Sequence, residues 1–211
     1  EEGGQTPDRG MLAGFPVIDV QISGDRIITH TLELPSEDTG AALPSVLIPG
    51  QKMHGAIDWD HRYSNMQNHS GEHILSGLLH RQWGYENVGF HLDDDVTIDF
   101  DGELTREQLI DVEKRANEAI YKNAKFTCEY PDEETLKNLS YRSKLELTEN
   151  VRIVTVEGYD VCACCAVHVY SASEIGIIKI LDFARHRGGI RVHLLCGKDA
   201  LEDYEKKYEK K

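Results

Sequence analysis

The chain has 211 residues, of which 40% are hydrophobic and 28% are charged, as is usual for a soluble globular protein of one or two domains. Its formal net charge of −14 argues against a non-specific nucleic-acid binder, because phosphates attract an excess of Lys and Arg. No apolar run approaches the roughly 20 residues that cross a bilayer, so we expect no membrane association.

The first 57 residues contain short predicted strands separated by glycine-containing turns. Strands are predicted at residues 16–22 and 26–32, joined by Ser23-Gly24-Asp25, and a third at residues 46–51. This pattern is typical of a small β-barrel. No signal peptide is visible, and the chain begins with Glu1 rather than Met, which leaves open whether native residues precede it.

The pattern becomes helical after residue 57. One helix is predicted at residues 64–83 and a second at about 105–123. Strands at 96–100, 126–130 and 151–156, a hairpin at 175–181 and 189–195, and a terminal helix at 198–211 complete the prediction. We expect an α+β fold: a small N-terminal β-barrel (residues 1–57), then a domain (residues 58–211) with two main helices on an antiparallel sheet.

Two pairs of side chains share a helical spacing. His69 and His73 lie four residues apart in the first predicted helix, so both rings can reach one ion. Cys164 and His168 have the same spacing, and together the pairs offer the nitrogen and sulfur ligands that zinc prefers. The chain has ten His, however, so one pair could arise by chance, and free Cys often behaves as a small buried hydrophobe. Spacing alone leaves both readings open.

Cysteines and cations are unevenly distributed. Three of the five Cys lie within residues 162–165, which does not suit a secreted disulfide framework and favours a reducing cytoplasm. Residues 179–198 carry five cations against one Asp, which could form a basic face on an acidic protein: Lys179, Arg185, Arg187, Arg191 and Lys198. On charge alone, a solvated strand pair is the better-supported alternative.

Four segments carry a more specific pattern, in this order: residues 2–10 (EGGQTPDRG), 57–62 (IDWDHR), 66–75 (MQNHSGEHIL) and 164–169 (CCAVHV). They resemble the glycine-rich motif, the Asp-Trp-x-x-Arg element, the HxxxH helix and the Cys-Gly-Gly-Thr-His-Val turn of the alanyl-tRNA synthetase editing domain and its free-standing, AlaX-type trans-editing relatives. The resemblance runs nearly end to end, and it makes a zinc site much better supported than none.

The resemblance implies a zinc-dependent hydrolase that deacylates mischarged tRNA(Ala), chiefly Ser-tRNA(Ala), with Gly-tRNA(Ala) as a second candidate. The implied zinc ligands are His69, His73, Cys164 and His168. Cys128, Cys162 and Cys165 are expected to be dispensable. The expected substrate pocket contains Ser70 and His91, the latter as the nearest polar candidate for a family Gln. The residues expected to contact tRNA are Gly3, Gly4, Arg62, Arg185, Arg187 and Arg191.

The sequence also departs from the family pattern. Cys165, Ala166 and Val167 replace Gly-Gly-Thr, so a family hydroxyl near the metal is absent. The strand that usually precedes the glycine motif is missing, which leaves open a truncated chain and an incomplete barrel. Glu72 directly precedes the second His, whereas the metalloprotease pattern places Glu after the first, so a solvated or structural Glu72 is expected.

Two alternative functions remain open at this point. Strong negative charge and the lack of a separate tRNA-binding domain favour a zinc hydrolase of a small ester or amide. Three nearby Cys favour a structural zinc module without catalysis, since four protein ligands normally make a closed site. The sequence does not indicate an oligomeric state.

Overall fold

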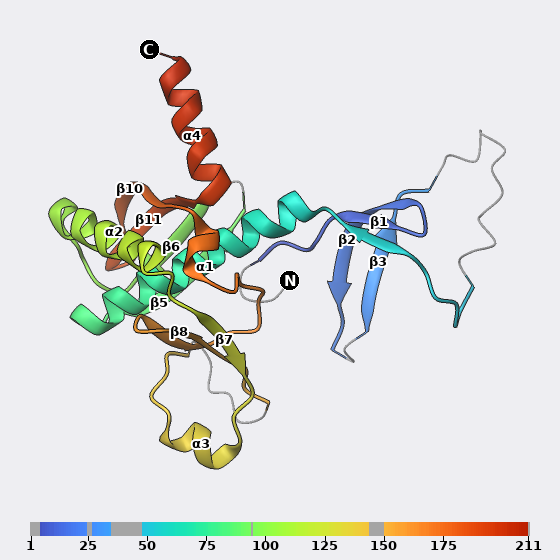
Figure 1. The fold of residues 1–211 in the computed structure, drawn as a ribbon, viewed down its shortest axis with the longest axis horizontal. Coiled ribbons are helices and arrows are strands. Elements are labelled where there is room, and N and C mark those ends of the chain that lie inside the picture. Colours follow the sequence, from blue (N-terminus) through green and yellow to red (C-terminus); the bar gives the residue numbers. More distant parts are fainter. Residues whose placement is uncertain (1–4, 25–26, 35–47, 94, 144–149, 211) are drawn as a thin grey trace. The chain divides into compact units, whose positions relative to one another are not determined.

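The computed structural model describes residues 5–24, 27–34, 48–93, 95–143 and 150–210 (Figure 1). The chain forms two compact units, one of residues 6–63 and one that comprises Gln5 and the residues from Ser64 onward. Helix α1 (Trp59–Trp83) begins in the first unit and continues into the second. No described helix combines the length and the apolar character that a bilayer crossing requires.

The first unit contains an antiparallel sheet with the strand order β3-β2-β1-β4. Its strands are β1 (Gly10–Leu12), β2 (Phe15–Ile22), β3 (Ile28–Leu32) and β4 (Gly55–Ile57). Ala13 and Gly14 join β1 to β2 with φ angles of 52° and 87°. Positive φ angles at both turn residues match the right-handed twist of the two strands. Strands β2 and β3 confirm the two strands predicted at residues 16–22 and 26–32.

The predicted β-barrel is wrong for the described residues. Strands β3 and β4 are the two edges of the sheet and do not pair with each other there, so the sheet is open. The predicted strand at 46–51 lies partly outside the described residues, and residues 48–51 form a turn in which the Gln51 amide donates to the Ile48 carbonyl (3.2 Å). Pro49-Gly50 favours that turn, and the strand follows it as β4.

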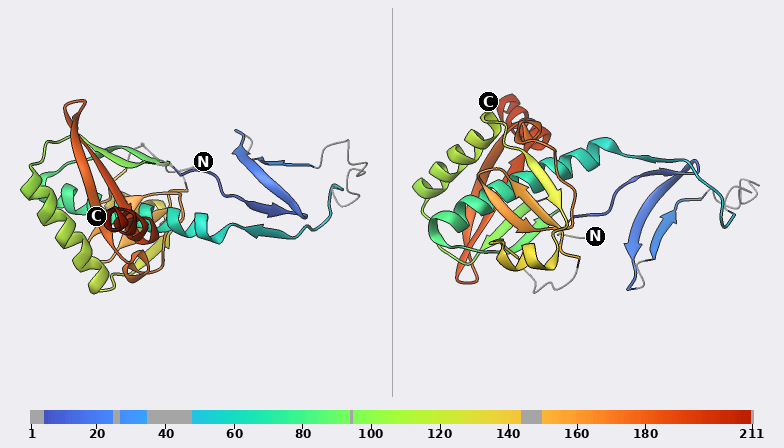
Figure 2. Two further views of the ribbon diagram at one scale, coloured as in Figure 1. Left: turned by 90° about the horizontal axis from the view of Figure 1, so that it is seen from above. Right: turned by 60° about the horizontal axis from the view of Figure 1, so that its bottom comes forward.

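The second unit is α+β, as predicted, but it contains two antiparallel sheets (Figures 1 and 2). The larger sheet has the order β10-β11-β6-β5, from β5 (Asn87–Leu92), β6 (Val96–Phe100), β10 (Ile178–His186) and β11 (Gly189–Cys196). The smaller sheet has the order β7-β8-β9, from β7 (Phe126–Glu129), β8 (Ile153–Val156) and β9 (Asp160–Ala163).

Helix α1 packs against both sheets of this unit. Every residue from Asn65 to Leu79 is buried, so this stretch has no solvent-facing side. Gly71 lies against the Cys196 and Ile178 side chains of the larger sheet, and Gly77 lies against Tyr159 and Asp160 at the start of β9. A Cβ atom at either glycine would collide with these groups, which explains why both positions lack a side chain.

Helices α2 (Arg106–Tyr121) and α4 (Gly197–Glu209) contact the larger sheet. Helix α2 begins at a capping box formed by Thr105 and Gln108, close to the predicted start. Asn117 ties α2 to β10, since its side chain donates to the Ile178 carbonyl (2.8 Å) and accepts from the Ile178 amide (3.0 Å). Helix α4 confirms the predicted terminal helix, while α3 (Glu133–Asn138) and the 3-10 turn η2 (Ala172–Ile175) were not predicted.

Candidate metal centre

Helix α1 brings His69 and His73 together one turn apart. Their ring centroids are 5.3 Å apart, and both side chains are buried in the second unit. Phe90 of β5 packs against the His69 ring at a centroid distance of 5.1 Å. The predicted helical spacing therefore produces a pair of rings that share one buried site.

The segment that carries Cys164 and His168 follows β9 and is held from two sides. Arg152, just before β8, donates from Nη1 to the carbonyls of Cys164 and Ala166, each at 2.8 Å. From α1, the Ser70 hydroxyl accepts a hydrogen bond from the Val169 amide (3.1 Å). These bonds fix the second pair of candidate ligands next to the first.

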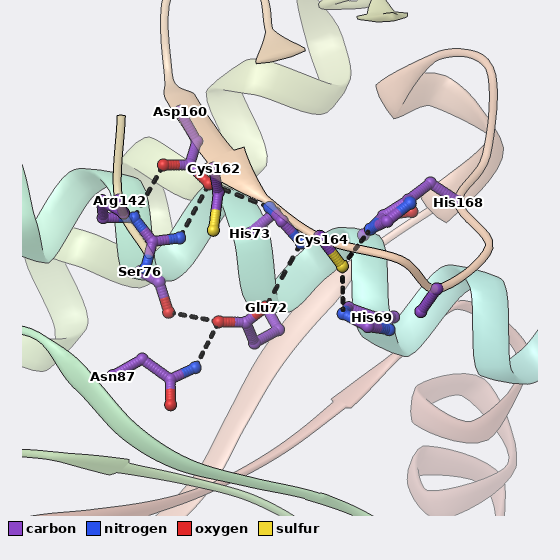
Figure 3. Close-up of polar contacts among 12 residues, drawn as sticks. His69, Glu72, His73, Ser76, Asn87, Arg142, Asp160, Cys162, Cys164 and His168 are labelled. Atoms are coloured by element: carbon purple, nitrogen blue, oxygen red, sulfur yellow. Dashed lines mark hydrogen bonds and ion pairs between the residues drawn. The ribbon is translucent and has the colours of Figure 1, made fainter. Parts of the chain in front are cut away.

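The four predicted ligands form one cluster (Figure 3). One donor atom from each of His69, His73, Cys164 and His168 lies within 4.8 Å of the other three. The Cys164 Sγ atom is 3.6 Å from His69 Nε2 and 3.7 Å from His168 Nε2. Zinc bonds of about 2.1 Å to nitrogen and 2.3 Å to sulfur would place tetrahedral ligand atoms about 3.4–3.6 Å apart. The donor set and its spacing therefore fit a zinc ion.

The cluster favours the thiolate form of Cys164. Burial raises the pKa of this thiol, but hydrogen bonds with His168, His69 and His73 outweigh burial and lower the pKa to about 2. Burial lowers the pKa of His168 to about 4, which keeps that ring neutral at pH 7. Burial lowers the pKa of His73, but the charge of Glu72 and the hydrogen bonds with Asp160 and Cys164 outweigh burial and raise this pKa well above its ordinary value. A thiolate and neutral imidazoles bind a metal ion, so His73 must release a proton when an ion binds.

His73 is in addition held by a buried ion pair. Its Nδ1 atom is 2.9 Å from Asp160 Oδ2, which leaves Nε2 for the cluster. Arg142 donates from Nε and Nη2 to the two oxygens of Asp160, both at 2.8 Å. Burial raises the pKa of Asp160, but the bonds from Arg142 and His73 outweigh it and hold this pKa far below its ordinary value. Asp160 is therefore an anion.

Glu72 is buried and hydrogen-bonded, so of the two expected alternatives, solvated or structural, the structure supports the structural one. Its Oε1 atom accepts hydrogen bonds from the Ser76 hydroxyl (2.6 Å) and from the Asn87 amide, while Oε2 lies 3.8 Å from His73 Nε2. Burial raises the pKa of Glu72, yet the charges of His73, Arg142 and His69 lower it overall. Because all sides of this helix are covered, its polar residues face partners rather than water.

The structure places the two expected pocket residues differently. Ser70 is fully buried beside the cluster, where its hydroxyl joins α1 to the ligand-bearing segment. His91 follows Phe90 on β5, and successive strand residues point to opposite faces of a sheet. Phe90 faces His69, so His91 lies on the other face, with its ring half exposed and 3.9 Å from Asp99 Oδ2. The structure therefore does not bring His91 to the four donors.

Most of the arginines expected to contact tRNA are paired with carboxylates. Arg62 binds Asp8 within the first unit. In the second unit, Arg191 makes two bonds of 2.6 Å to Asp99, and Arg185 lies 3.2 Å from Glu103. Lys179 similarly contacts Glu113 at 2.6 Å. Arg187, with φ of 46° at the tip of the β10–β11 hairpin, makes no side-chain hydrogen bond or ion pair with described residues. Gly3 and Gly4 lie outside the described residues.

Several residues around the centre were not predicted: Phe90, Arg142, Arg152 and Asp160. Asp160 and Arg142 are far from His73 in the sequence and follow no helical or strand period with it. The only sequence signal is the turn Gly158-Tyr159-Asp160, which indicates a chain reversal but not a partner. Such contacts can be identified only once the positions of β9 and α1 relative to each other are known.

Comparisons with known proteins agree with the predicted resemblance. Residues 151–193 match the model of the threonyl and alanyl tRNA synthetase second additional domain. The chain is 32% identical over 209 residues to the alanyl-tRNA editing protein AlaX-L of Pyrococcus horikoshii, which covers 95% of this chain and 50% of that protein. It is 27% identical over 214 residues to the alanyl-tRNA editing protein Aarsd1 of Danio rerio, with coverages of 99% and 49%.

A match to alanine–tRNA ligase of Ignicoccus hospitalis has 30% identity over 220 residues and covers 98% of this chain but 23% of the ligase. The chain thus spans about half the length of the editing proteins that it matches, and a smaller part of the ligase. Because these matches extend over nearly all of its residues, the chain is similar along its length to AlaX- and Aarsd1-type alanyl-tRNA editing proteins.

Proposed function

We propose that this chain is a zinc-dependent deacylase that removes serine, and to a lesser extent glycine, from mischarged tRNA(Ala). One observation carries the proposal: His69, His73, Cys164 and His168 place four zinc-compatible donor atoms within 4.8 Å of one another in a chain that is similar to alanyl-tRNA editing proteins. The identity of the metal, the aminoacyl group and the tRNA substrate are proposed in addition to this observation.

The cluster offers chemistry suited to ester hydrolysis. A zinc ion supplies Lewis acidity that polarises a carbonyl group or a water molecule. The chain itself supplies a thiolate at Cys164, a ring at His73 that is oriented by Asp160, and a second anion at Glu72 whose Oε2 faces the His73 ring. Glu72 thus places an acceptor oxygen beside the centre, held in position through Ser76 and Asn87.

Selectivity for serine follows from the hydroxyl that alanine lacks. A site that hydrogen-bonds a substrate hydroxyl penalises the analogue without it, because its own polar groups are then left unpaired. We propose Ser70 as a contributor, since its oxygen lies between α1 and the ligand-bearing segment. We do not retain His91 in the pocket, because Phe90 occupies the side of β5 that faces the centre.

For tRNA docking, we propose the hairpin cations Arg185, Arg187 and Arg191, together with Arg62 and the Gly3-Gly4 motif. Arg187 is the strongest of these candidates, since it is exposed at a turn and carries no carboxylate partner among the described residues. Arg185 is exposed and pairs with the exposed Glu103, an interaction of small free energy that phosphate could displace.

Turnover of three substrates, with and without a chelator, tests the proposal. We expect hydrolysis of Ser-tRNA(Ala), slower hydrolysis of Gly-tRNA(Ala), none of Ala-tRNA(Ala), and loss of all activity when zinc is removed. Equal hydrolysis of seryl and alanyl esters would contradict the proposed selectivity. Hydrolysis of a small seryl ester as fast as Ser-tRNA(Ala) would instead identify a hydrolase that does not recognise tRNA.

One structural feature favours a second candidate, a zinc module without catalysis. Four protein donors complete a tetrahedral shell, and such closed shells are typical of structural sites. Under that alternative, the protein binds zinc tightly, loses stability with chelator, and turns over none of the three charged tRNAs. The same assay therefore separates the two candidates.

A further inference from the structure

Arg142 lies in an irregular segment but is nearly inaccessible to solvent. Its backbone extends the smaller sheet by one bridge beside β9: the Arg142 amide donates to the Val161 carbonyl (2.8 Å), and the Ala163 amide donates to the Arg142 carbonyl (2.9 Å). Its side chain is 7% exposed. A backbone fixed on both sides thus directs a buried cation toward α1.

The guanidinium of Arg142 meets a carboxylate that already has another partner. Asp160 Oδ2 is 2.8 Å from Arg142 Nη2 and 2.9 Å from His73 Nδ1, while Oδ1 accepts from Arg142 Nε (2.8 Å). The Asp160 side chain is 2% exposed. Two parallel bonds from a planar guanidinium fix the carboxylate plane, and the carboxylate in turn fixes the His73 ring (Figure 3).

The other two histidines of the cluster lack such support. The Nδ1 atoms of His69 and His168 are buried, and neither has a hydrogen-bond partner among the described residues. His73 is therefore the one ring of the three whose outer nitrogen is held by an anion in the described part of the chain. A carboxylate on the outer nitrogen sets the tautomer and the direction of a metal-binding imidazole.

We propose that Arg142 is a positioning residue of the metal centre, acting through Asp160 to hold His73 with Nε2 directed at the ion. This inference rests on the proposed zinc centre and adds a residue far from all four ligands in the sequence. Burying two charges is costly, and a buried ion pair often adds no net stability. The Arg142–Asp160 pair contacts the candidate ligand His73. Orienting this ligand explains why the pair is buried there, whereas a gain in stability does not.

The surroundings of Arg142 permit a sharp test. A cavity of about 550 Å³ borders Arg142 and Asp160, with Gly77, Arg81 and Tyr159 among its other lining residues. Arg142→Ala would enlarge this space, and free guanidinium ion could then enter and bind Asp160. Arg142→Lys keeps the charge but cannot form two parallel bonds. Asp160→Asn keeps the shape and removes the anion.

The experiment measures zinc affinity of the full chain by competition with a chromophoric chelator, and records the visible spectrum of the cobalt-substituted protein. We expect Arg142→Lys and Asp160→Asn to weaken zinc binding about 10–100-fold and to shift the cobalt bands. Low, non-denaturing concentrations of guanidinium should restore affinity in Arg142→Ala, while urea should not. The matched control is Arg191→Lys, which alters a similar two-bond pair with Asp99 on the larger sheet and should leave zinc affinity unchanged.

Wild-type affinity and an unshifted cobalt spectrum in Arg142→Lys would overturn the inference, whether or not Arg142→Ala folds. Equal loss of affinity in Arg191→Lys would also overturn it, because the effect would then be general destabilisation. If the wild-type chain binds no zinc, both the proposed zinc centre and this inference are wrong. If zinc binding responds as expected but no charged tRNA is hydrolysed, the positioning role stands and the proposed function fails.

Discussion

The metal centre groups side chains that can bind a metal ion, and the β10–β11 hairpin groups cations. The first group converges in the structure, whereas most of the second is paired with carboxylates. At the centre, four donor atoms converge, with Cys164 Sγ at 3.6 and 3.7 Å from two imidazole nitrogens. On the hairpin, Arg185 and Arg191 each face a carboxylate from elsewhere in the chain. Helical spacing fixes the direction of a side chain, whereas a count of charges says nothing about the partners that other segments supply.

Removing the thiolate should produce the largest effect on the centre. We expect Cys164→Ser to weaken zinc binding by more than about 100-fold, beyond the loss typical of residues that only support a ligand. The matched controls are Cys165→Ser and Cys128→Ser, both at exposed thiols, and Cys162→Ser at a buried one. Elemental analysis of purified proteins measures the outcome. Full zinc in Cys164→Ser together with loss in Cys162→Ser would show that the ligand assignment is wrong.

A smaller effect is expected where the two ligand-bearing segments join. Ser70→Ala removes the acceptor of the buried Val169 amide, and an unsatisfied buried donor costs about 1–3 kcal/mol. Urea unfolding of the zinc-loaded protein measures this loss, with the exposed Ser173→Ala as control. An unchanged free energy of unfolding, combined with lost discrimination between seryl and alanyl esters, would assign Ser70 to the substrate rather than to the fold.

The hairpin should respond in its interaction with tRNA rather than with metal. Replacing Arg185 and Arg187 by Ala should raise the apparent KM for Ser-tRNA(Ala) and leave zinc content unchanged. Each lost phosphate contact should reduce the salt dependence of log KM by about 1. Steady-state kinetics over a range of salt concentrations measures both. An unchanged KM, or turnover that is independent of salt, would place tRNA on another surface.

The sequence predicted best those features that depend on local period. Strand β6 and the hairpin follow from apolar spacing, and α2 follows from its capping residues. Helix α4 was predicted from its charged composition, and His69 and His73 share a face because of the helical repeat. Strand β9 was not predicted, because its four residues combine Asp160 with cysteine and lack a clear alternation. The Arg142–Asp160 pair depends on how β9 meets α1, and no local pattern encodes that meeting.

Sequence patterns were least informative where the outcome depends on strand pairing or on the burial of a side chain. Short strands with turns suggested a barrel, but closure requires that the two edge strands meet, and β3 and β4 do not pair in the described part of the sheet. For Glu72, the sequence left a solvated and a structural role open. The structure supports the structural role, because residues 65–79 of α1 are all buried, which a single amphipathic period does not reveal.

The smallest expected effect concerns the exposed pair on the hairpin. Glu103→Gln should free Arg185 and lower the apparent KM for Ser-tRNA(Ala) less than about fivefold, since exposed pairs contribute about 0–1 kcal/mol. The free energy of unfolding should change by no more than about 1 kcal/mol. The comparison variant is Glu133→Gln, which alters an exposed pair with Lys137 on α3. A similar change in KM for both variants would indicate a general charge effect.

X-ray absorption at the zinc edge tests the central claim most directly. The protein loaded with one zinc ion should show one sulfur neighbour at about 2.3 Å and three imidazole nitrogens at about 2.0–2.1 Å. Cys164→Ser should lose the sulfur signal, and Cys165→Ser should keep it. Two or more sulfur neighbours, or a shell of oxygen atoms without sulfur, would contradict a centre built from His69, His73, Cys164 and His168.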